Sequence, residues 1–524
     1  MKTILNKTGL VFILAIALNA CSDDFLNKQP TDRLSAEVFY TSKADLDKAL
    51  TSCYALIQNQ SFTWSVPIFE CISDNGYGTT GIWNTENIAR GPVTPTTGSI
   101  GDIYSTSYSR IARYNIFLKN LADYSGSDIG SDERARYEAE ARLLRGMAYF
   151  ELYKFYGAVP LIVEPLTYET QNQPKAEENA IWNQVMEDVD YAIARLPAVA
   201  FAQNNGHFVK TAAQVVKARA LIYTAYNEDK TAKPDVMNQV RQLTGEIIST
   251  GFYRIESSYR GLFCDDLGEQ DGNPEFIFTV NYQGPLNPAY AAYNEGPYIG
   301  YCLPIDRGGR CLPLPNFVRE YEFIDGTSFS ENNPLYDPAD IYKNRDPRMK
   351  QTVFTEIVTF ENGFSNSAGP AITGFSFWKI VTGTNALDMY TPNLNSDWPL
   401  MRYAEVLLMH AEAVNELDGP TEEVYNAINS IRARTGVDMP PLASGLTKDQ
   451  MRQTIRKERR IELAFEGFRY DDVKRWKIAE ERLNMEASEG VVNRTFEKRN
   501  YHWPLPQAEV DKSNGILLQN PDYI

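Results

Sequence analysis

Apolar side chains recur every three or four residues in long stretches near both ends of the chain. The clearest stretch follows Ser131, where one face of a predicted helix carries Ala141, Leu144, Ala148, Leu152 and Phe155. Gly157, with Pro160 beyond it, is typical of the end of such a helix. The same spacing predicts helices within residues 42–57, 181–197, 211–226, 236–251, 401–417 and 421–436, and one that opens at Thr447 with a Thr447–Gln450 capping box.

These predicted helices follow one another in pairs joined by short turns, which favours a mainly α fold. The arrangement resembles tetratricopeptide-type stacking, although the consensus of that repeat is not clean here. Helical pairs of this kind bury their apolar faces by stacking on their neighbours. We expect a tetratricopeptide-like scaffold built mainly from residues 36–58, 131–250 and 400–480.

Two long segments, residues 60–110 and 255–400, have little periodicity and are rich in Gly, Pro, Asn and Tyr. They contain only short strand-like pieces, such as EFIFTVNY. Long irregular stretches in a compact domain are usually functional. We therefore expect binding loops, displayed by the helical scaffold within one domain that spans residues 21–524.

The first 20 residues have the layout of a secretory signal peptide. Lys2 and Lys7 supply positive charge before an apolar run over residues 8–18. This run is roughly half as long as the ~20 residues that span a bilayer. Ala20 places a small residue directly before Cys21, a pattern that resembles a bacterial lipobox. We expect Cys21 to be acylated and to anchor the mature protein on a membrane. An ordinary signal peptide with an incidental cysteine is the alternative.

Charge and histidine content narrow the classes of partner. A formal net charge of −17 argues against nucleic acid, whose phosphates require clustered Lys and Arg, and against docking onto anionic lipid. The three histidines lie far apart and none has metal-ligand spacing. We expect no cofactor and no metal centre, while an oxygen-ligated structural calcium site in the loops stays open.

The acidic residues after Cys21, Asp23 and Asp24, fit either an export signal to the outer leaflet or a flexible linker.

Six stretches, in order along nearly the whole chain, resemble the SusD/RagB-like family of nutrient-binding outer-membrane lipoproteins. They are CSDDFLNKQPTD, AEARLLRGMAYFELYKFYGAVPLI, RYAEVLLMHAEAVNE, AINSIRARTG, RKERRIELAFEGFRYDDVKRW and LPQAEVDKSNGILLQNPDY. The resemblance implies a tetratricopeptide-like core, attachment to the outer surface of a Gram-negative cell, and a TonB-dependent SusC-like transporter as partner. It also implies capture of glycan fragments, or of peptides in some branches of the family.

Two aromatic clusters in the irregular segments are candidates for sugar binding. A pyranose ring packs its C–H face on an aromatic ring, while its hydroxyls bond to polar side chains. The first cluster, SDNGYGTTGIWNTENIARG, offers Trp83, Tyr77, Asn84 and Arg90. The family resemblance implies a glycan-contacting aromatic in this segment, and Trp83 is the leading candidate.

The second cluster lies in NYQGPLNPAYAAYNEGPYIGYCLPIDRGGRC and offers Tyr290, Tyr293, Tyr298 and Tyr301. These tyrosines form either a sugar platform or a contact with the transporter, because tyrosine is also enriched at protein interfaces. Cys302 and Cys311 are close enough in the sequence to staple this loop in an exported protein. Whether they form that disulfide stays open.

The acids of RRIELAFEGFRYDDVKRW suggest a catalytic alternative, because paired carboxylates hydrolyse glycosidic bonds. These acids, Glu462, Glu466, Asp471 and Asp472, are interleaved with arginines and Lys474 on helical segments. We expect a structural network of salt bridges rather than an acid–base pair. The leading hypothesis is therefore a non-enzymatic lipoprotein that delivers glycan to a transporter; a peptide-binding lipoprotein and a surface glycoside hydrolase are the alternatives.

Overall fold

The computed structural model describes residues 40–58, 69–78, 85–264, 270–282, 311–355, 372–379, 397–486 and 493–524. The signal segment and Cys21 lie outside these residues. Within them, no helix is both long enough and apolar enough to cross a membrane.

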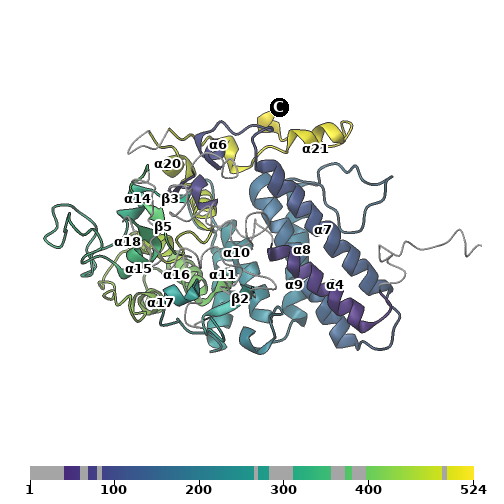
Figure 1. Ribbon diagram of the computed structural model, residues 1–524, viewed down its shortest axis with the longest axis horizontal. Helices are drawn as coiled ribbons and strands as arrows, with labels where there is room; N and C mark the ends of the chain where they lie inside the picture. Colours follow the sequence, from purple (N-terminus) through teal and green to yellow (C-terminus); the bar gives the residue numbers. More distant parts are fainter. Residues whose placement is uncertain are drawn as a thin grey trace, which may run out of the picture.

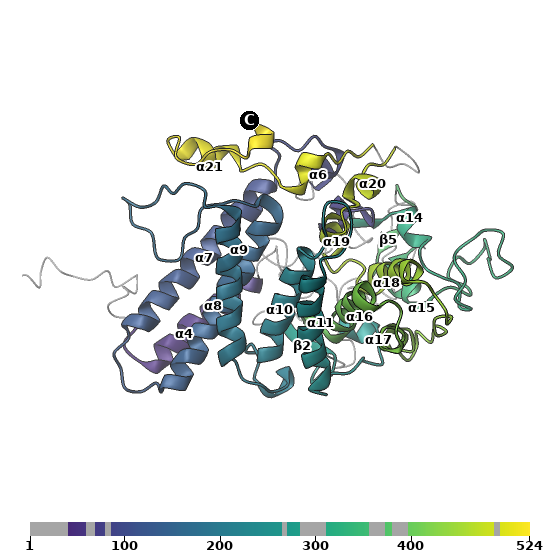
Figure 2. The ribbon, with the colours of Figure 1, turned by 180° about the vertical axis from the view of Figure 1, so that it is seen from behind.

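The N-terminal half is a row of long antiparallel helices. Their bounds are α4 Lys43–Ala55, α7 Ile100–Asp123, α8 Ser131–Tyr156, α9 Glu178–Arg195, α10 Lys210–Tyr223 and α11 Pro234–Ser249. From α7 to α11 each helix packs on the next one in the chain, and α4 packs against α7 and α8. Figures 1 and 2 show α4, α7, α8 and α9 side by side at one end of the molecule. This arrangement confirms the expected scaffold of stacked helices.

Helices α16 to α18 continue the same row, and three shorter helices follow them in the described part of the chain. Their bounds are α16 Tyr403–Asp418, α17 Glu422–Arg432, α18 Lys448–Glu462, α19 Arg469–Arg475, α20 Ala479–Leu483 and α21 Gln507–Lys512. Helix α16 packs directly on α11 and then carries α17 and α18 on its other side. A second apolar cluster, which includes Leu408, Ile428 and Ile455, forms between α16, α17 and α18.

Short strands and helical turns fill the segment between α11 and α16 and the segment before α7. The strands are β1 Gly76–Gly78, β2 Phe276–Val280, β3 Cys311–Pro313, β4 Val353–Phe354, β5 Ser376–Phe377 and β6 Trp398–Arg402, and the short α-helices are α6 Thr85–Arg90, α14 Pro315–Val318 and α15 Pro347–Thr352. The 3-10 turns, which also occur outside these two segments, are η1 Leu56–Gln58, η2 Glu70–Ile72, η3 Phe201–Gln203, η4 Arg260–Leu262, η6 Lys498–Tyr501 and η7 Pro521–Tyr523. Three antiparallel pairs join β1 to β3, β2 to β6 and β4 to β5. The β2–β6 pair joins the start and the end of the irregular segment between α11 and α16. Helix α16 follows β6 directly and packs on α11.

The sequence-based expectation for residues 60–110 was wrong at its C-terminal end, because α7 begins at Ile100. The first turns of α7 bury Ile103 and Tyr104, but also the polar side chains of Ser107 and Arg110. Arg110 donates through Nε to the carbonyl of Leu56 at 3.1 Å. Because these buried polar residues interrupt the apolar repeat, the periodicity did not reveal the helix.

A network of buried ion pairs joins the C-terminal elements. Arg402 at the end of β6 donates to Glu275 (2.8 Å), Glu462 (2.7 Å) and Glu466 (2.7 Å). Arg434 pairs with Glu275 and Glu462 at 2.7 Å each. Glu462 and Glu466 come from the acidic motif RRIELAFEGFRYDDVKRW, so the structure confirms that these acids belong to a network of salt bridges.

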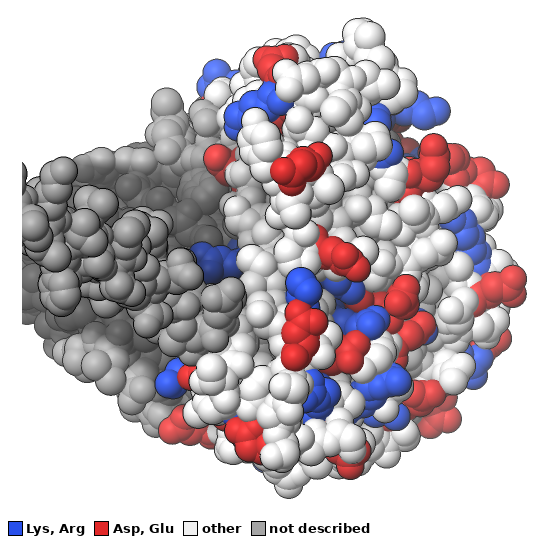
Figure 3. Space-filling model, turned by 90° about the vertical axis from the view of Figure 1, so that its right-hand side faces the viewer, with Lys and Arg blue, Asp and Glu red and all other residues white. Residues whose placement is uncertain are grey.

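The face of the scaffold shown in Figure 3 carries side chains of both charge signs in close alternation. Several ion pairs on the scaffold helices join residues four positions apart, such as Lys43 with Asp47 at 3.1 Å and Lys119 with Asp123 at 2.9 Å. Such exposed pairs contribute only about 0.3–0.5 kcal/mol each. Their value lies in keeping the helices solvated rather than in holding the fold together.

Candidate functional site

The β1–β3 pair joins the two aromatic segments that the sequence singled out. Its register places Gly76 opposite Pro313, Tyr77 opposite Leu312, and Gly78 opposite Cys311. Gly78 leads into residues 79–84, and Cys311 follows residues 283–310. The two segments therefore leave from one end of the same ribbon, although they lie far apart in the sequence. We call this pair the β1–β3 ribbon.

Several candidate ligand residues lie outside the described part of the chain. They are Trp83, Asn84, Tyr290, Tyr293, Tyr298 and Tyr301, together with Cys302. Their predicted roles in glycan, transporter or disulfide contact stay predictions. What the structure provides is the position of the residues from which their segments emerge.

Glycine allows the β1–β3 ribbon to pack closely on its support. All three residues of β1 are buried. A Cβ atom at Gly78 would collide with the Thr85 hydroxyl oxygen and lie 3.3 Å from the Cβ atom of Cys71. A Cβ atom at Gly76 would lie 3.2 Å from the ring of Phe465. Larger residues at these two positions would push β1 away from η2.

Buried arginines fix the backbone that leads into the ribbon. Arg494 donates to the carbonyls of Cys71 (3.2 Å), Ser73 (2.8 Å) and Gly76 (2.9 Å). Charged donors of this kind form hydrogen bonds that are roughly twice as strong as neutral ones. The segment 71–76 is therefore held rigidly from beneath.

Asp74 joins the ribbon to the C-terminal helices. It accepts two hydrogen bonds from Arg469, at 2.7 and 2.8 Å, and lies 3.2 Å from Arg460. Burial raises the pKa of Asp74, but Arg460 and Arg469 outweigh it and hold the pKa well below its usual range. Sequence reasoning placed the two arginines in a salt-bridge network but missed Asp74, because its partners lie almost 400 residues away in the chain.

The structure corrects the expectation for Tyr77, which is a buried strand residue and not an exposed loop aromatic. Its side chain is 5% exposed and packs with Leu312 and Leu314. Its hydroxyl group donates to Glu86 at 2.7 Å. Arg90 pairs with the same carboxylate and keeps a side chain that is 45% exposed. Of the two described candidates, Arg90 alone is open to a ligand.

Within the described residues, Cys311 lies next to Cys71, which is not the cysteine that the sequence suggested as its partner. The sulfur atom of Cys311 lies 3.3 Å from the sulfur atom of Cys71, and both residues are buried. The predicted bridge to Cys302 is not tested by this contact, since Cys302 lies outside the described residues.

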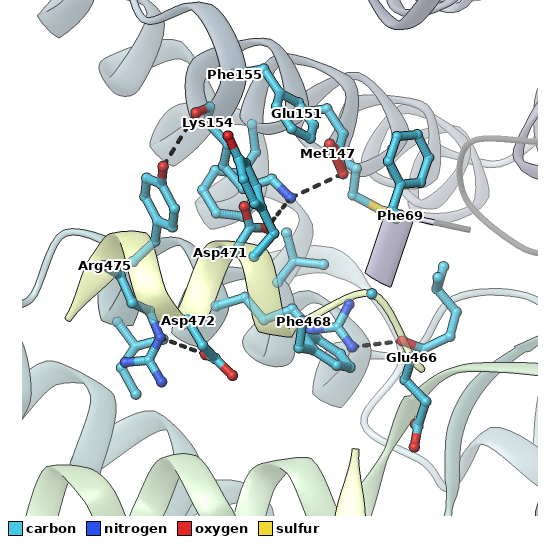
Figure 4. A pocket seen from close by; sticks show the side chains of 18 of the residues that line it. Phe69, Met147, Glu151, Lys154, Phe155, Glu466, Phe468, Asp471, Asp472 and Arg475 are labelled. Atoms are coloured by element: carbon cyan, nitrogen blue, oxygen red, sulfur yellow. Dashed lines mark hydrogen bonds and ion pairs between the residues drawn. The ribbon is translucent and has the colours of Figure 1, made fainter. Parts of the chain in front are cut away.

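A separate cavity of about 160 Å³ lies between α8, α10, α19 and β6. Figure 4 shows that aromatic and aliphatic side chains such as Phe69, Met147 and Phe468 line much of it. Lys154 donates to Asp471 at 2.6 Å and lies 3.1 Å from Glu151, and Figure 4 draws both contacts.

Other charged groups of the cavity wall also form ion pairs. Arg475 pairs with Asp472 at 2.8 Å and with Glu412 at 2.6 Å. Ion pairs and apolar contacts in the wall of the cavity thus connect α8 to α19. The cavity lining includes Ile72 of η2 but no residue of β1 or β3. Nowhere in the described residues do three or more His, Cys, Asp or Glu side chains form a group that could hold a metal ion.

Comparisons with known proteins agree with this architecture over nearly the whole chain. A family model described as the SusD family matches residues 274–523, and a second, described as starch-binding associating with outer membrane, matches residues 24–223. SusD-like protein P2 of Formosa agariphila is 26% identical, and the alignment covers 99% of this chain and 100% of that protein. A SusD-like protein of Bacteroides ovatus is 22% identical, with 90% and 82% covered.

Solved structures show the same fold. The crystal structure of a SusD-like carbohydrate binding protein from Bacteroides fragilis is 27% identical, covers 93% of this chain and 100% of its own, and superposes with a TM-score of 0.74. A laminarin binding SusD-like protein is 23% identical, covers 92% and 100%, and gives a TM-score of 0.71. The matching family models, the full-length relatives and the shared helical fold lead to one conclusion: the chain belongs to the SusD/RagB-like family.

Proposed function

We propose that this protein captures oligosaccharides or polysaccharide at the cell surface and delivers them to a TonB-dependent SusC-like transporter of the outer membrane. The observation that carries the proposal is the register of the β1–β3 ribbon. It places the starting points of the Trp83 segment and of the tyrosine-rich segment side by side, on a support held by buried arginines.

This arrangement suits sugar recognition for a physical reason. Sugar binding requires aromatic faces for the C–H side of the ring and polar groups for the hydroxyls. The two segments together hold Trp83, four tyrosines and Asn84, and the partly exposed Arg90 lies next to them in the chain. A rigid base limits the conformational entropy that the segments lose when they bind.

The comparisons support the proposed cargo and location. The Bacteroides fragilis neighbour is named as a carbohydrate binding protein, and one matching family model is described as starch-binding and outer-membrane associated. Acylation of Cys21 would hold the protein on that membrane, in line with the lipobox-like sequence before it.

Binding without catalysis fits the chemistry of the acidic motif. Glu462 is fully buried and paired with Arg348, Arg402 and Arg434. A general acid must carry a proton near neutral pH, but these arginines overcome the effect of burial and hold the pKa of Glu462 far below its usual range. Glu462 is therefore a poor candidate for glycoside hydrolysis.

A binding screen with product analysis tests the proposal. Lipid-free protein beginning at Ser22 is applied to panels of polysaccharides, oligosaccharides and peptides, and each glycan is then analysed for new reducing ends. The proposal expects binding to one class of glycan with no cleavage. Binding to peptides alone would replace glycan with peptide cargo, and turnover of a bound glycan would show a hydrolase.

A further inference from the structure

Two buried cysteines meet beneath the β1–β3 ribbon. The sulfur atoms of Cys71 and Cys311 are 3.3 Å apart, although 240 positions separate the residues in the sequence. A disulfide bond has an S–S distance of about 2.05 Å, so bond formation requires the sulfurs to approach by roughly 1.2 Å. Neither side chain is exposed to solvent.

The surrounding backbone holds the two cysteines in this position. Cys311 is opposite Gly78 in the ribbon, and the missing Cβ atom of Gly78 leaves space next to the Cβ atom of Cys71. The carbonyl of Cys71 accepts a hydrogen bond from Arg494. The proximity of the sulfurs therefore follows from strand register, close packing and a buried donor, and not from one rotatable side chain.

We propose that Cys71 and Cys311 form a disulfide bond that staples η2 to β3. The thiolate of one cysteine attacks the disulfide of a thiol–disulfide oxidoreductase and releases one of its thiolates. The second cysteine thiolate then attacks the mixed disulfide and releases the other. Two protein thiols thus lose two protons and two electrons, and the oxidant becomes a dithiol. Because both sulfurs are buried in the native state, the reaction takes place while the chain folds.

The staple would lie at the base of both aromatic segments. It links η2 covalently to β3 at the end of the ribbon where residues 79–84 leave it and residues 283–310 enter it. Formation in the cell rests on the proposed function, since disulfides persist in oxidising compartments outside the cytoplasm. The pairing of these two cysteines in the folded protein does not depend on glycan binding.

Peptide mapping after refolding in a glutathione redox buffer tests the pairing directly. The chain from Ser22 is unfolded, reduced, and refolded with reduced and oxidised glutathione; remaining thiols are alkylated before digestion with trypsin and Glu-C. Cleavage after Glu70 and Glu86 gives a peptide 71–86, and cleavage after Arg310 and Arg319 gives a peptide 311–319. Cys53, Cys264 and Cys302 then lie on separate peptides.

The proposal expects peptides 71–86 and 311–319 to be joined without reductant, with the other three cysteines alkylated. The variant Cys302→Ser keeps that linked pair, whereas Cys71→Ser loses it. A link between Cys302 and Cys311, or alkylation of all five cysteines, would overturn the proposal. These outcomes are independent of the glycan screen, so failure of one leaves the other standing.

Discussion

At the scale of single residues, buried charge is the dominant feature of the C-terminal half. Arg402 is 1% exposed and compensates three carboxylates at once, on Glu275, Glu462 and Glu466. A buried ion pair adds little net stability relative to an apolar pair, but removal of one partner leaves an uncompensated charge that costs about 3–5 kcal/mol. The network therefore fixes the relative positions of β2, β6 and α18 more than it increases stability.

Arg402→Met tests this role. We expect the free energy of unfolding, measured by urea denaturation, to fall by at least about 3 kcal/mol. The control is Arg241→Met, whose partner Asp418 lies at 2.9 Å in a pair that is 41% and 47% exposed; it should lose less than about 1 kcal/mol. Equal losses in the two variants would contradict the network interpretation.

Lys474 is a second buried charge, with fewer compensating groups. It is 1% exposed, and its ammonium group donates to the carbonyl of Lys154 at 2.8 Å. Burial is the main cause that lowers its pKa from 10.5 to about 7; Lys154 and Lys477 lower it further, while Asp471 and Glu151 oppose the change. Between pH 7 and 10.5 the unfolded chain therefore binds the additional proton, so this group makes the free energy of unfolding rise with pH.

Lys474→Met removes that dependence. Below pH 7 the wild-type protein carries the full cost of the buried charge, and at pH 9 it has lost most of it. The stability of the variant relative to wild type should therefore be more favourable at pH 6 than at pH 9, by about 3 kcal/mol. Urea denaturation at both pH values measures the difference, with Lys48→Met, 70% exposed, as the control. A relative stability that does not change with pH would refute this account.

At the scale of elements, most of the long helices were predictable, but α7 and the β1–β3 ribbon were not. The capping box of Thr447 and Gln450 is present as expected, because it depends on two residues three positions apart. The β1–β3 ribbon depends on partners more than 200 residues apart, and its strands are too short to give an alternating pattern. The sequence identified the two aromatic segments, but only the fold brings their starting points together.

Gly78→Ala tests the ribbon as the support of the site. The new Cβ atom would crowd Thr85 and Cys71, and overpacking of this kind costs typically about 1–3 kcal/mol. We expect the affinity for the glycan found in the screen to fall about tenfold, a factor that corresponds to about 1.4 kcal/mol. Isothermal titration calorimetry measures the change.

The matched control for this change is Gly130→Ala. Gly130 precedes α8 with an ordinary backbone φ of −76°, and a Cβ atom there would meet nothing within 4 Å. Glycan affinity should be unchanged in this variant. If Gly78→Ala also left the glycan affinity unchanged, the ribbon would not be a support of the binding site.

At the scale of the whole molecule, the stacked helices form the scaffold and the short strands support the proposed binding segments. The stacked helices form a continuous row from α7 through α11 to α16 and α18. Strands β3 and β5 lie toward the end of the molecule away from α4 and α7, whereas β2 lies in the middle beside α10 and α11 (Figures 1 and 2). The proposed lipid anchor at Cys21 precedes α4 in the chain.

Cys21→Ala tests the attachment to the membrane. Without the acyl chains, the protein should move from the membrane fraction to the supernatant after cell lysis and ultracentrifugation. Metabolic labelling with palmitate should mark the wild-type protein and the control Cys302→Ser, and should not mark Cys21→Ala. Membrane retention of an unlabelled Cys21→Ala protein would show that another interaction holds it.

Glycan binding by Trp83→Ala is the most direct test of the central claim, that the segments rooted on the β1–β3 ribbon capture sugar. The control is Tyr168→Ala, because Tyr168 is 84% exposed on the loop between α8 and α9, far along the chain from both aromatic segments. Stacked pairs of aromatic rings contribute on the order of 0.5–1.5 kcal/mol beyond area burial, and we expect a similar contribution from a sugar ring on the face of Trp83. We predict that Trp83→Ala loses at least about tenfold in affinity, corresponding to about 1.4 kcal/mol, while Tyr168→Ala binds like wild type. Undiminished binding by Trp83→Ala would contradict the account.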